Sequence, residues 1–202
     1  MTPWKHQLEI ADQGYDVLKQ NAILYLAMEE RTGKSLTALL IAEMAKVLKI
    51  LIITKKKALP DWQTLIAGFG GSKYYHAVNY HQLCNLKDKQ WDLIIFDEAH
   101  NYISAPKPAK SAIWLCAKRF AAGVPIIYLS ATPHAQTPGQ LYHQLALSDW
   151  SPWQSYKDYK TWHATYGVPY TIYLGQREVP GWDRVEDDRV LARVNHLFIT
   201  KT

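Results

Sequence analysis

Residues 22–35 read AILYLAMEERTGKS, an apolar run followed by a polar loop that ends in Gly33, Lys34 and Ser35. The run at 22–27 carries no charge, which is typical of a strand buried on both faces of a parallel sheet. Residues 34–47 then place apolar side chains at helical spacing. A strand, a loop and a helix in this order form one unit of an α/β sheet.

The same alternation continues along the chain in both directions. A helix is predicted over residues 5–19, and further strands are predicted at 50–53, 74–78, 92–96 and 126–129. Helical stretches are predicted from Pro60 onward, near 80–86 and over 109–120. Strands that alternate with helices predict an α/β fold, with a mostly parallel sheet and helices on both faces.

The composition is that of an ordinary globular protein. A chain of 202 residues fits one α/β domain, with or without an appended segment. Hydrophobic residues make up 48% and charged residues 20%, which excludes disorder and fibrous repeats. The net charge of +5 makes a polyanionic partner plausible, although a merely soluble basic protein fits it equally well.

Cys84 and Cys116 lie far apart in the sequence and have no C-x-x-C partner. This spacing suggests neither a disulfide framework nor a zinc cluster, so we expect both to be small core residues. The first residues do not resemble a signal peptide, and no apolar run approaches the roughly 20 residues that span a bilayer. We therefore expect a cytoplasmic protein with no membrane partner.

The character of the sequence changes after residue 149. Aromatic residues crowd a predicted helix there: Trp150, Trp153, Tyr156, Tyr159, Trp162 and Tyr166. They could pack against the sheet or stack on nucleic-acid bases, and their spacing favours a buried helix face. We predict a sheet domain at residues 1–149 and a mainly helical extension at 150–202.

Residues 28–35 match the second half of the phosphate-loop pattern G-x-x-x-x-G-K-[ST], with Met28 in place of the first glycine. In that motif, backbone N–H groups hold phosphate oxygens, a lysine reaches the β- and γ-phosphates, and a hydroxyl holds Mg²⁺. A G-K-S tripeptide alone could be a simple helix start, but the strand before it and the helix after it favour the phosphate loop. The predicted phosphate-binding residues are Glu30, Arg31, Thr32, Gly33, Lys34 and Ser35.

Two carboxylates end the apolar run at 93–96, namely Asp97 and Glu98. Ligands of parallel sheets bind beyond the carboxyl ends of the strands. We expect Asp97 to hold Mg²⁺ together with Ser35, and Glu98 to polarise an attacking water. An acidic helix N-terminus is the alternative, and the phosphate loop argues against it.

A third strand end carries Ser130, Ala131 and Thr132 before Pro133. Such a tripeptide alone would be a plain turn. In a parallel sheet its two hydroxyls are expected to approach the same rim as Lys34 and Glu98.

The order of these motifs resembles that of superfamily 2 helicase-like ATPases, and within them the Swi/Snf-type double-stranded DNA translocases and their phage and restriction-enzyme relatives. The resemblance implies a RecA-like lobe of the P-loop NTPase class that binds ATP and Mg²⁺, with Lys34, Asp97 and Glu98 catalytic. Gln7, in Pro3-Trp4-Lys5-His6-Gln7, resembles the adenine-reading glutamine. Asp97-Glu98-Ala99-His100 resembles the DEAH box, and the residues implied in coupling are His100, Ser130 and Thr132.

The resemblance also implies contacts with nucleic acid, most of all double-stranded DNA. Lys55, Lys56 and Lys57 follow a segment similar to the motif that touches the phosphate backbone, and a solvated turn is the alternative there. Tyr80, in residues 79–83, resembles a tyrosine in the nucleic-acid-binding region of the same family.

The chain also departs from the family pattern. Met28 replaces a glycine, Ser130-Ala131-Thr132 stands where many relatives have a Gly-Thr version, and residues 198–201 lack paired arginines at the exit toward a second lobe. Nothing after Thr202 supplies that second RecA-like lobe, so we expect a piece of a longer chain that hydrolyses ATP poorly on its own. For a phage protein the location would be the host cytoplasm.

Two other functions remain open from the sequence. The first is a nucleotide-binding regulatory or nucleic-acid-docking module that does not cycle. The second is a nucleotide kinase that uses the same phosphate loop. It is disfavoured because the residues at the Asp97 and Ser130 strand ends would have no function in such an enzyme.

Overall fold

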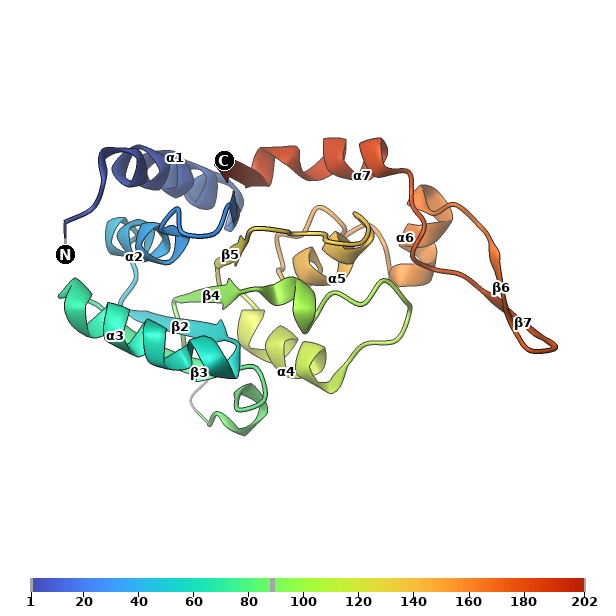
Figure 1. Ribbon diagram of the computed structural model, residues 1–202, viewed down its shortest axis with the longest axis horizontal. Helices are drawn as coiled ribbons and strands as arrows, with labels where there is room; N and C mark the ends of the chain where they lie inside the picture. Colours follow the sequence, from blue (N-terminus) through green and yellow to red (C-terminus); the bar gives the residue numbers. More distant parts are fainter. Residues whose placement is uncertain (1, 88–89, 202) are drawn as a thin grey trace.

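The computed structural model describes residues 2–87 and 90–201 and contains a six-stranded parallel sheet of order β3-β2-β4-β5-β1-β8 (Figure 1). The strands are β1 (Ile23–Met28), β2 (Lys49–Thr54), β3 (Tyr74–Asn79), β4 (Leu93–Asp97), β5 (Ile126–Ser130) and β8 (Phe198–Lys201). This confirms the predicted α/β fold. The sequence predicted the first five strands and missed β8.

Helices cover both faces of the sheet because successive side chains of a strand point to opposite faces. In β1, Leu24 and Leu26 pack with helices on one face, whereas Ile23 and Tyr25 join the core of the other face. The first face holds α1 (Lys5–Asn21), α2 (Lys34–Met44) and α3 (Leu59–Phe69). The second holds α4 (Ala112–Ala121), α5 (Gln140–Leu145), α6 (Tyr159–Tyr166) and α7 (Asp187–Val194).

The segment after residue 149 is less helical than predicted. The aromatic helix is only α6, and Trp150, Trp153 and Tyr156 precede it in turns. An antiparallel hairpin of β6 (Thr171–Leu174) and β7 (Arg177–Pro180) then projects from the body, before β8 returns to the sheet edge beside β1 (Figure 1).

Packing is confirmed for five of the six predicted aromatic residues, whereas Trp150 is 46% exposed. Trp153, Tyr159 and Trp162 are buried in the same core cluster as the second face of the sheet. A fully covered ring offers no face on which a base could stack, so these three residues hold the C-terminal segment to the sheet.

Residues 80–86 do not form the predicted α-helix. The Asn79 side chain accepts hydrogen bonds from the backbone N–H groups of His81 and Gln82, at 3.0 and 3.1 Å. Such an asparagine turn competes with helix formation. The segment continues as a single 3₁₀ turn, η2 (Leu83–Asn85). The other such turns are η1 (Lys56–Ala58), η3 (Ala99–Asn101) and η4 (Asn195–Leu197).

The expectation for the two cysteines is wrong. Cys84 of η2 and Cys116 of α4 form a disulfide, with their Cα atoms 5.3 Å apart. Cys84 is exposed and Cys116 is half-buried, so neither is a core residue. The two are separated by 32 positions. Only the tertiary structure brings them together, and their spacing in the sequence carried no signal of the pair.

Membrane insertion has no support from the helices. Within residues 2–87 and 90–201, none combines the length and the apolar character that a membrane span requires.

Candidate active site

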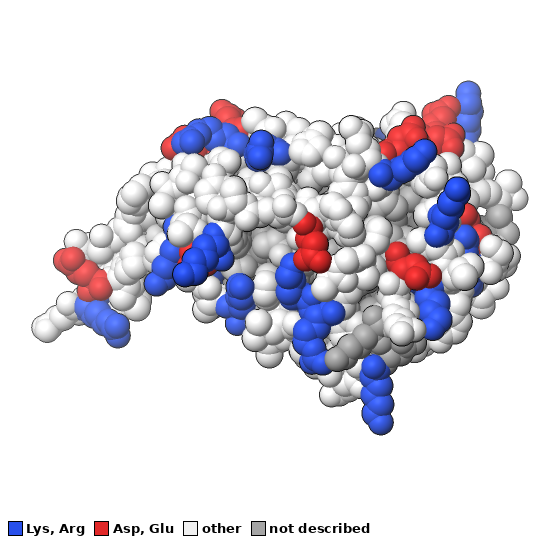
Figure 2. All heavy atoms as spheres, turned by 180° about the vertical axis from the view of Figure 1, so that it is seen from behind, with Lys and Arg blue, Asp and Glu red and all other residues white. Residues whose placement is uncertain are grey.

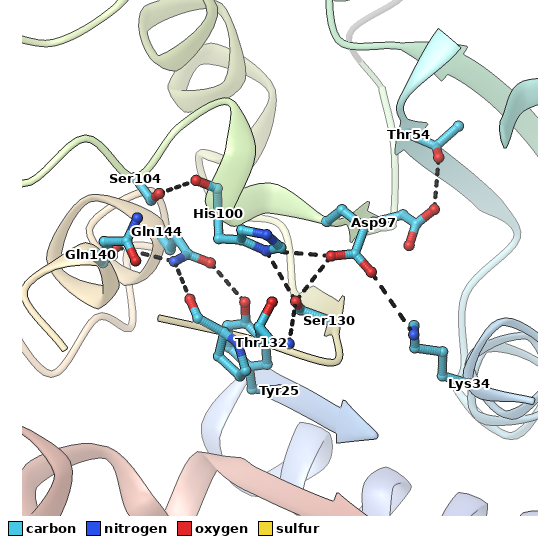
Figure 3. A network of polar contacts seen from close by, with 12 residues as sticks. Tyr25, Lys34, Thr54, Asp97, His100, Ser104, Ser130, Thr132, Gln140 and Gln144 are labelled. Carbon is cyan, nitrogen blue, oxygen red and sulfur yellow. Dashed lines mark hydrogen bonds and ion pairs between the residues drawn. The ribbon is translucent and has the colours of Figure 1, made fainter. Parts of the chain in front are cut away.

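Three neighbouring strand ends meet at one edge of the sheet. Lys34 opens α2 after β1, Glu98 follows β4, and Ser130 ends β5. The Lys34 Nζ atom lies 3.8 Å from Glu98 Oε1, and the Ser130 hydroxyl donates to Glu98 Oε2 at 3.0 Å. Lys34, Ser130 and His100 are labelled in Figure 3, where they point toward one another. The structure therefore brings together the three side chains that the sequence placed at a common rim.

Asp97 is held rigidly beside this group. Its Oδ2 atom accepts hydrogen bonds from Thr54 Oγ1 at 2.7 Å and from Trp62 Nε1 at 2.9 Å. Thr54 was not predicted as a site residue. It ends β2, which pairs with β4, so a hydroxyl at the end of the neighbouring strand was the signal available in the sequence. Asp97 Oδ1 accepts no hydrogen bond from a described residue, so this oxygen can face a ligand.

Glu98 adopts an uncommon backbone conformation. Its φ is 54°, in the left-handed region, and its N–H donates to Leu129 O at 2.8 Å. This conformation costs an L-residue other than glycine roughly 1–2 kcal/mol, and such residues gather at functional sites. The turn at Glu98 carries its carboxylate to Lys34 and Ser130.

His100 and Ser130 form a hydrogen-bonded chain that leads to Glu98. Ser130 Oγ lies 3.0 Å from His100 Nδ1 and accepts the N–H of Thr132 at 3.0 Å. Because Ser130 gives its single proton to Glu98, the shared proton of the His100 contact must sit on Nδ1. Burial lowers the pKa of His100, the Glu98 carboxylate raises it, and the Lys55 ammonium lowers it further. The net effect is a pKa below the ordinary value of a histidine, which favours the neutral imidazole.

The phosphate-loop residues follow β1 as an exposed turn. Glu30 and Arg31 are exposed, and the Thr32 hydroxyl donates to Glu29 O at 2.7 Å. Arg31 and Gly33 both have positive φ, of 63° and 81°. The loop thus makes a tight turn just before α2, where backbone N–H groups point out of the helix start.

Gln7 of α1 lies directly on this loop. Its Oε1 accepts the backbone N–H of Trp4 at 2.8 Å, and its Nε2 would lie 1.9 Å from a Cβ atom added to Gly33. The Gln7 side chain is buried. The residue predicted to read adenine is therefore positioned by contact with the phosphate loop.

We expect Gly33→Ala to lower the free energy of unfolding more than Gly70→Ala does. Both glycines have positive φ, at 81° and 68°, but nothing lies within 4 Å of a Cβ added to Gly70. Gly70→Ala measures the left-handed backbone cost alone, roughly 1–2 kcal/mol. Gly33→Ala adds the collision with Gln7. Urea unfolding of both variants checks this, and equal losses would show that Gln7 simply moves aside.

The predicted nucleic-acid residues divide into two groups. Lys55, Lys56 and Lys57 are exposed at the end of β2, and Lys55 is near enough to His100 to affect its pKa. Tyr80 is fully buried, and its hydroxyl donates to Asp97 O at 2.9 Å. The prediction that Tyr80 contacts nucleic acid is wrong, because a side chain with no exposed surface supports the site from inside.

The residues present can accommodate a nucleotide-bound magnesium ion. Across residues 2–87 and 90–201, no three or more His, Cys, Asp or Glu side chains gather to hold a metal by themselves. Mg²⁺ that arrives with phosphates needs only one or two protein oxygens. The Asp97 Oδ1 atom and the Ser35 hydroxyl, neither of which bonds to a described residue, are oxygen donors of the required kind.

Comparisons with known proteins show the fold. No known family model matches the chain, and no curated protein matches its sequence. The chain is similar to the Sulfolobus solfataricus SWI2/SNF2 ATPase core in complex with dsDNA, with a TM-score of 0.76 and 17% identity. It is also similar to the SWI2/SNF2 ATPase core domain of the same organism, with a TM-score of 0.69 and 18% identity.

Each of these two likenesses covers 100% of this chain and 45% of the solved chain. This chain thus has the RecA-like fold of part of a SWI2/SNF2 ATPase core and spans less than half the length of the proteins it resembles.

Proposed function

We propose that this chain is the ATP-binding lobe of a motor that hydrolyses ATP with Mg²⁺ and moves along double-stranded DNA. The observation that carries the proposal is the 3.8 Å approach of Lys34 Nζ to Glu98 Oε1 at neighbouring strand ends. A cation for phosphates and a carboxylate for water lie at one edge of a parallel sheet, where ligands of such sheets bind. The likeness to SWI2/SNF2 ATPase cores supports the same function.

Each residue has one task in this mechanism. The backbone of residues 30–33 and the Lys34 ammonium hold the β- and γ-phosphates, and Gln7 contacts the adenine. Glu98 orients and polarises the attacking water. Ser35 and Asp97 would hold Mg²⁺, which would supply positive charge beside the phosphate oxygens.

The hydrogen-bonded chain from Glu98 through Ser130 to His100 suits a coupling role. Ser130 bonds to both partners, and Thr132 N–H bonds to Ser130. Any movement of Glu98 on hydrolysis therefore disturbs residues at the ends of both β4 and β5. We propose that this chain links the state of the nucleotide to the rest of the motor.

The motor requires more than this chain provides. An arginine that reaches across from a second lobe is worth about 10³ to 10⁵ in rate in related reactions. We propose that a second RecA-like lobe completes the site. Residues 1–149 form the first lobe together with β8, which pairs with β1, and the segment 150–202 leads toward the second lobe. The chain alone is then a weak ATPase.

The proposed DNA contacts are the three lysines at the end of β2. Lys55, Lys56 and Lys57 are exposed, and contacts to phosphates fix position without reading sequence. This is the kind of contact that a motor needs when it travels over any sequence.

The test compares ATP turnover by the intact protein with duplex DNA, single-stranded DNA and RNA. We expect the greatest stimulation by duplex DNA, and we expect it to weaken as salt rises, because binding through phosphates releases counterions. If only RNA stimulated turnover, the motor would move along RNA and not along DNA. Equally low turnover in all three arms would instead favour a nucleotide-binding module that does not cycle.

A further inference from the structure

A second polar cavity lies away from the proposed nucleotide site. It has a volume of about 260 Å³ and is formed by α4, α5 and the segment from Ser148 to Lys157. Three lysines line it, Lys110, Lys118 and Lys157, with Asp149 as the one acidic residue among its lining residues. Neither Lys34 nor Glu98 lines this cavity. A ligand here would bind independently of the phosphate loop.

The charges that line the cavity are not balanced. The Asp149 carboxylate accepts hydrogen bonds from Lys118 Nζ at 3.0 Å and from the N–H of Gly123 at 2.7 Å. The hydrogen bond from Lys118 lowers the pKa of Asp149. Lys110 and Lys157 form no ion pair with a described residue. Three ammonium groups against one carboxylate leave a formal charge of +2 on the walls.

Three of the residues that line the cavity also carry hydrogen-bond donors that have no described acceptor. Ser148 Oγ and Ser151 Oγ each accept a backbone N–H at 3.1 Å, and neither hydroxyl donates a hydrogen bond to a described residue. Both serines are buried. The indole N–H of Trp153, a residue only 2% exposed, has no acceptor among the described residues. Leaving a buried donor unpaired costs about 1–3 kcal/mol.

The surplus of cations and donors calls for a ligand that is anionic and rich in acceptor oxygens. A phosphate monoester carries a charge of about −1.5 to −2 at pH 7 together with three strong acceptor oxygens. This charge matches the walls, whereas a single carboxylate would leave part of it uncompensated. The aromatic side chain of Tyr156 also lines the cavity and can pack against an organic part of the ligand. The Trp114 ring is already covered by the Lys110 ammonium, which lies 4.4 Å from its centroid.

We propose that this cavity is a binding site for a phosphate group, presented either by a small phosphorylated molecule or by a nucleic-acid backbone. The basic surface of the molecule is compatible with both sources. Figure 2 shows that Lys and Arg side chains outnumber acidic ones over the lower half of one face. Both sources share one chemistry and are separated by experiment.

The test follows the indole N–H signal of Trp153 in ¹H–¹⁵N NMR spectra, assigned by triple-resonance experiments. The chain carries Lys34→Ala, so that phosphates do not bind at the phosphate loop. Pyrophosphate is titrated in one arm and a short DNA duplex in the other, both without Mg²⁺. We expect the Trp153 signal to move in a saturable manner in at least one arm, and the arm in which it moves identifies the source.

Charge reversal at the cavity provides the matched comparison. Lys110→Glu combined with Lys157→Glu is expected to weaken the titration by about tenfold or more. Lys19→Glu combined with Lys46→Glu, two exposed lysines that do not line the cavity, is expected to leave it within about twofold. Equal weakening by both pairs would mean a general charge effect and would overturn the proposal.

Two further results are decisive. A Trp153 signal that stays in place in both arms shows that the cavity does not bind phosphate. The two proposals can also be judged separately. If the Trp153 signal shifts but the unmodified chain binds no ATP, the phosphate site is supported and the proposed motor function is not.

Discussion

Replacing Lys34 by alanine is expected to weaken ATP binding by about 10²-fold or more. Hydrogen bonds to charged groups contribute about 1.5–3 kcal/mol each, and a lysine that reaches two phosphates makes two of them. The loss is increased by Glu98, whose carboxylate lies 3.8 Å from the Lys34 ammonium. Without that ammonium, Glu98 and Asp97 repel the triphosphate.

Isothermal titration with ATP and Mg²⁺ measures this effect. Lys46→Ala is the control, because Lys46 is exposed just after the same helix, α2. Urea unfolding of both variants shows whether the fold is kept. If the folded Lys34→Ala chain bound ATP with unchanged affinity, the nucleotide would have to lie elsewhere.

The sequence indicated the rim of the site because the carboxyl ends of parallel strands share one edge. Lys34, Glu98 and Ser130 each follow a strongly apolar run, so each could be placed at a strand end before the order of the strands was known. Their contacts depend on the order β4-β5-β1, which no local pattern contains. The sequence could therefore predict which residues share an edge, but not which of them touch.

The residues that support the site were harder to predict, because their role depends on tertiary neighbours. Tyr80 follows a strand as Lys55 does, yet it is buried and bonds to Asp97 O, whereas Lys55 is exposed. Thr54 and Trp62 meet on one oxygen of Asp97 from two different elements. Nothing in the spacing of these residues distinguishes a support from a ligand contact.

The C-terminal segment was misread for a related reason. β8 is short and includes the polar residues Thr200 and Lys201, so its apolar signal is weak. It forms a strand because the edge of β1 offers it hydrogen-bond partners, with Tyr25 opposite Phe198 and Leu26 opposite Ile199. The aromatic residues other than Trp150 pack as predicted. The helix is shorter than predicted because turns precede it, such as the one in which the Trp153 N–H donates to Ser151 Oγ.

Glu98→Gln is expected to lower DNA-stimulated ATP turnover by about 10²- to 10⁴-fold, the usual contribution of a positioned general base. ATP affinity should change by no more than about threefold, because Lys34 and the loop backbone remain. Glutamine keeps the shape of glutamate, and its amide oxygen can still accept the Ser130 hydroxyl that now donates at 3.0 Å. The substitution removes the negative charge of the carboxylate, and with it the ion pair to Lys34 at 3.8 Å, but keeps the contact with Ser130.

The measurement pairs single-turnover hydrolysis with duplex DNA and equilibrium titration of ATP, both on the intact protein. Glu9→Gln, at an exposed position of α1, controls for the loss of one negative charge. Ser130→Ala removes one hydrogen bond to Glu98 Oε2 but keeps the carboxylate. We therefore expect a smaller loss of turnover than with Glu98→Gln. Retained DNA-stimulated turnover by Glu98→Gln would exclude Glu98 as the residue that activates water, because no other change in that variant could restore the lost carboxylate.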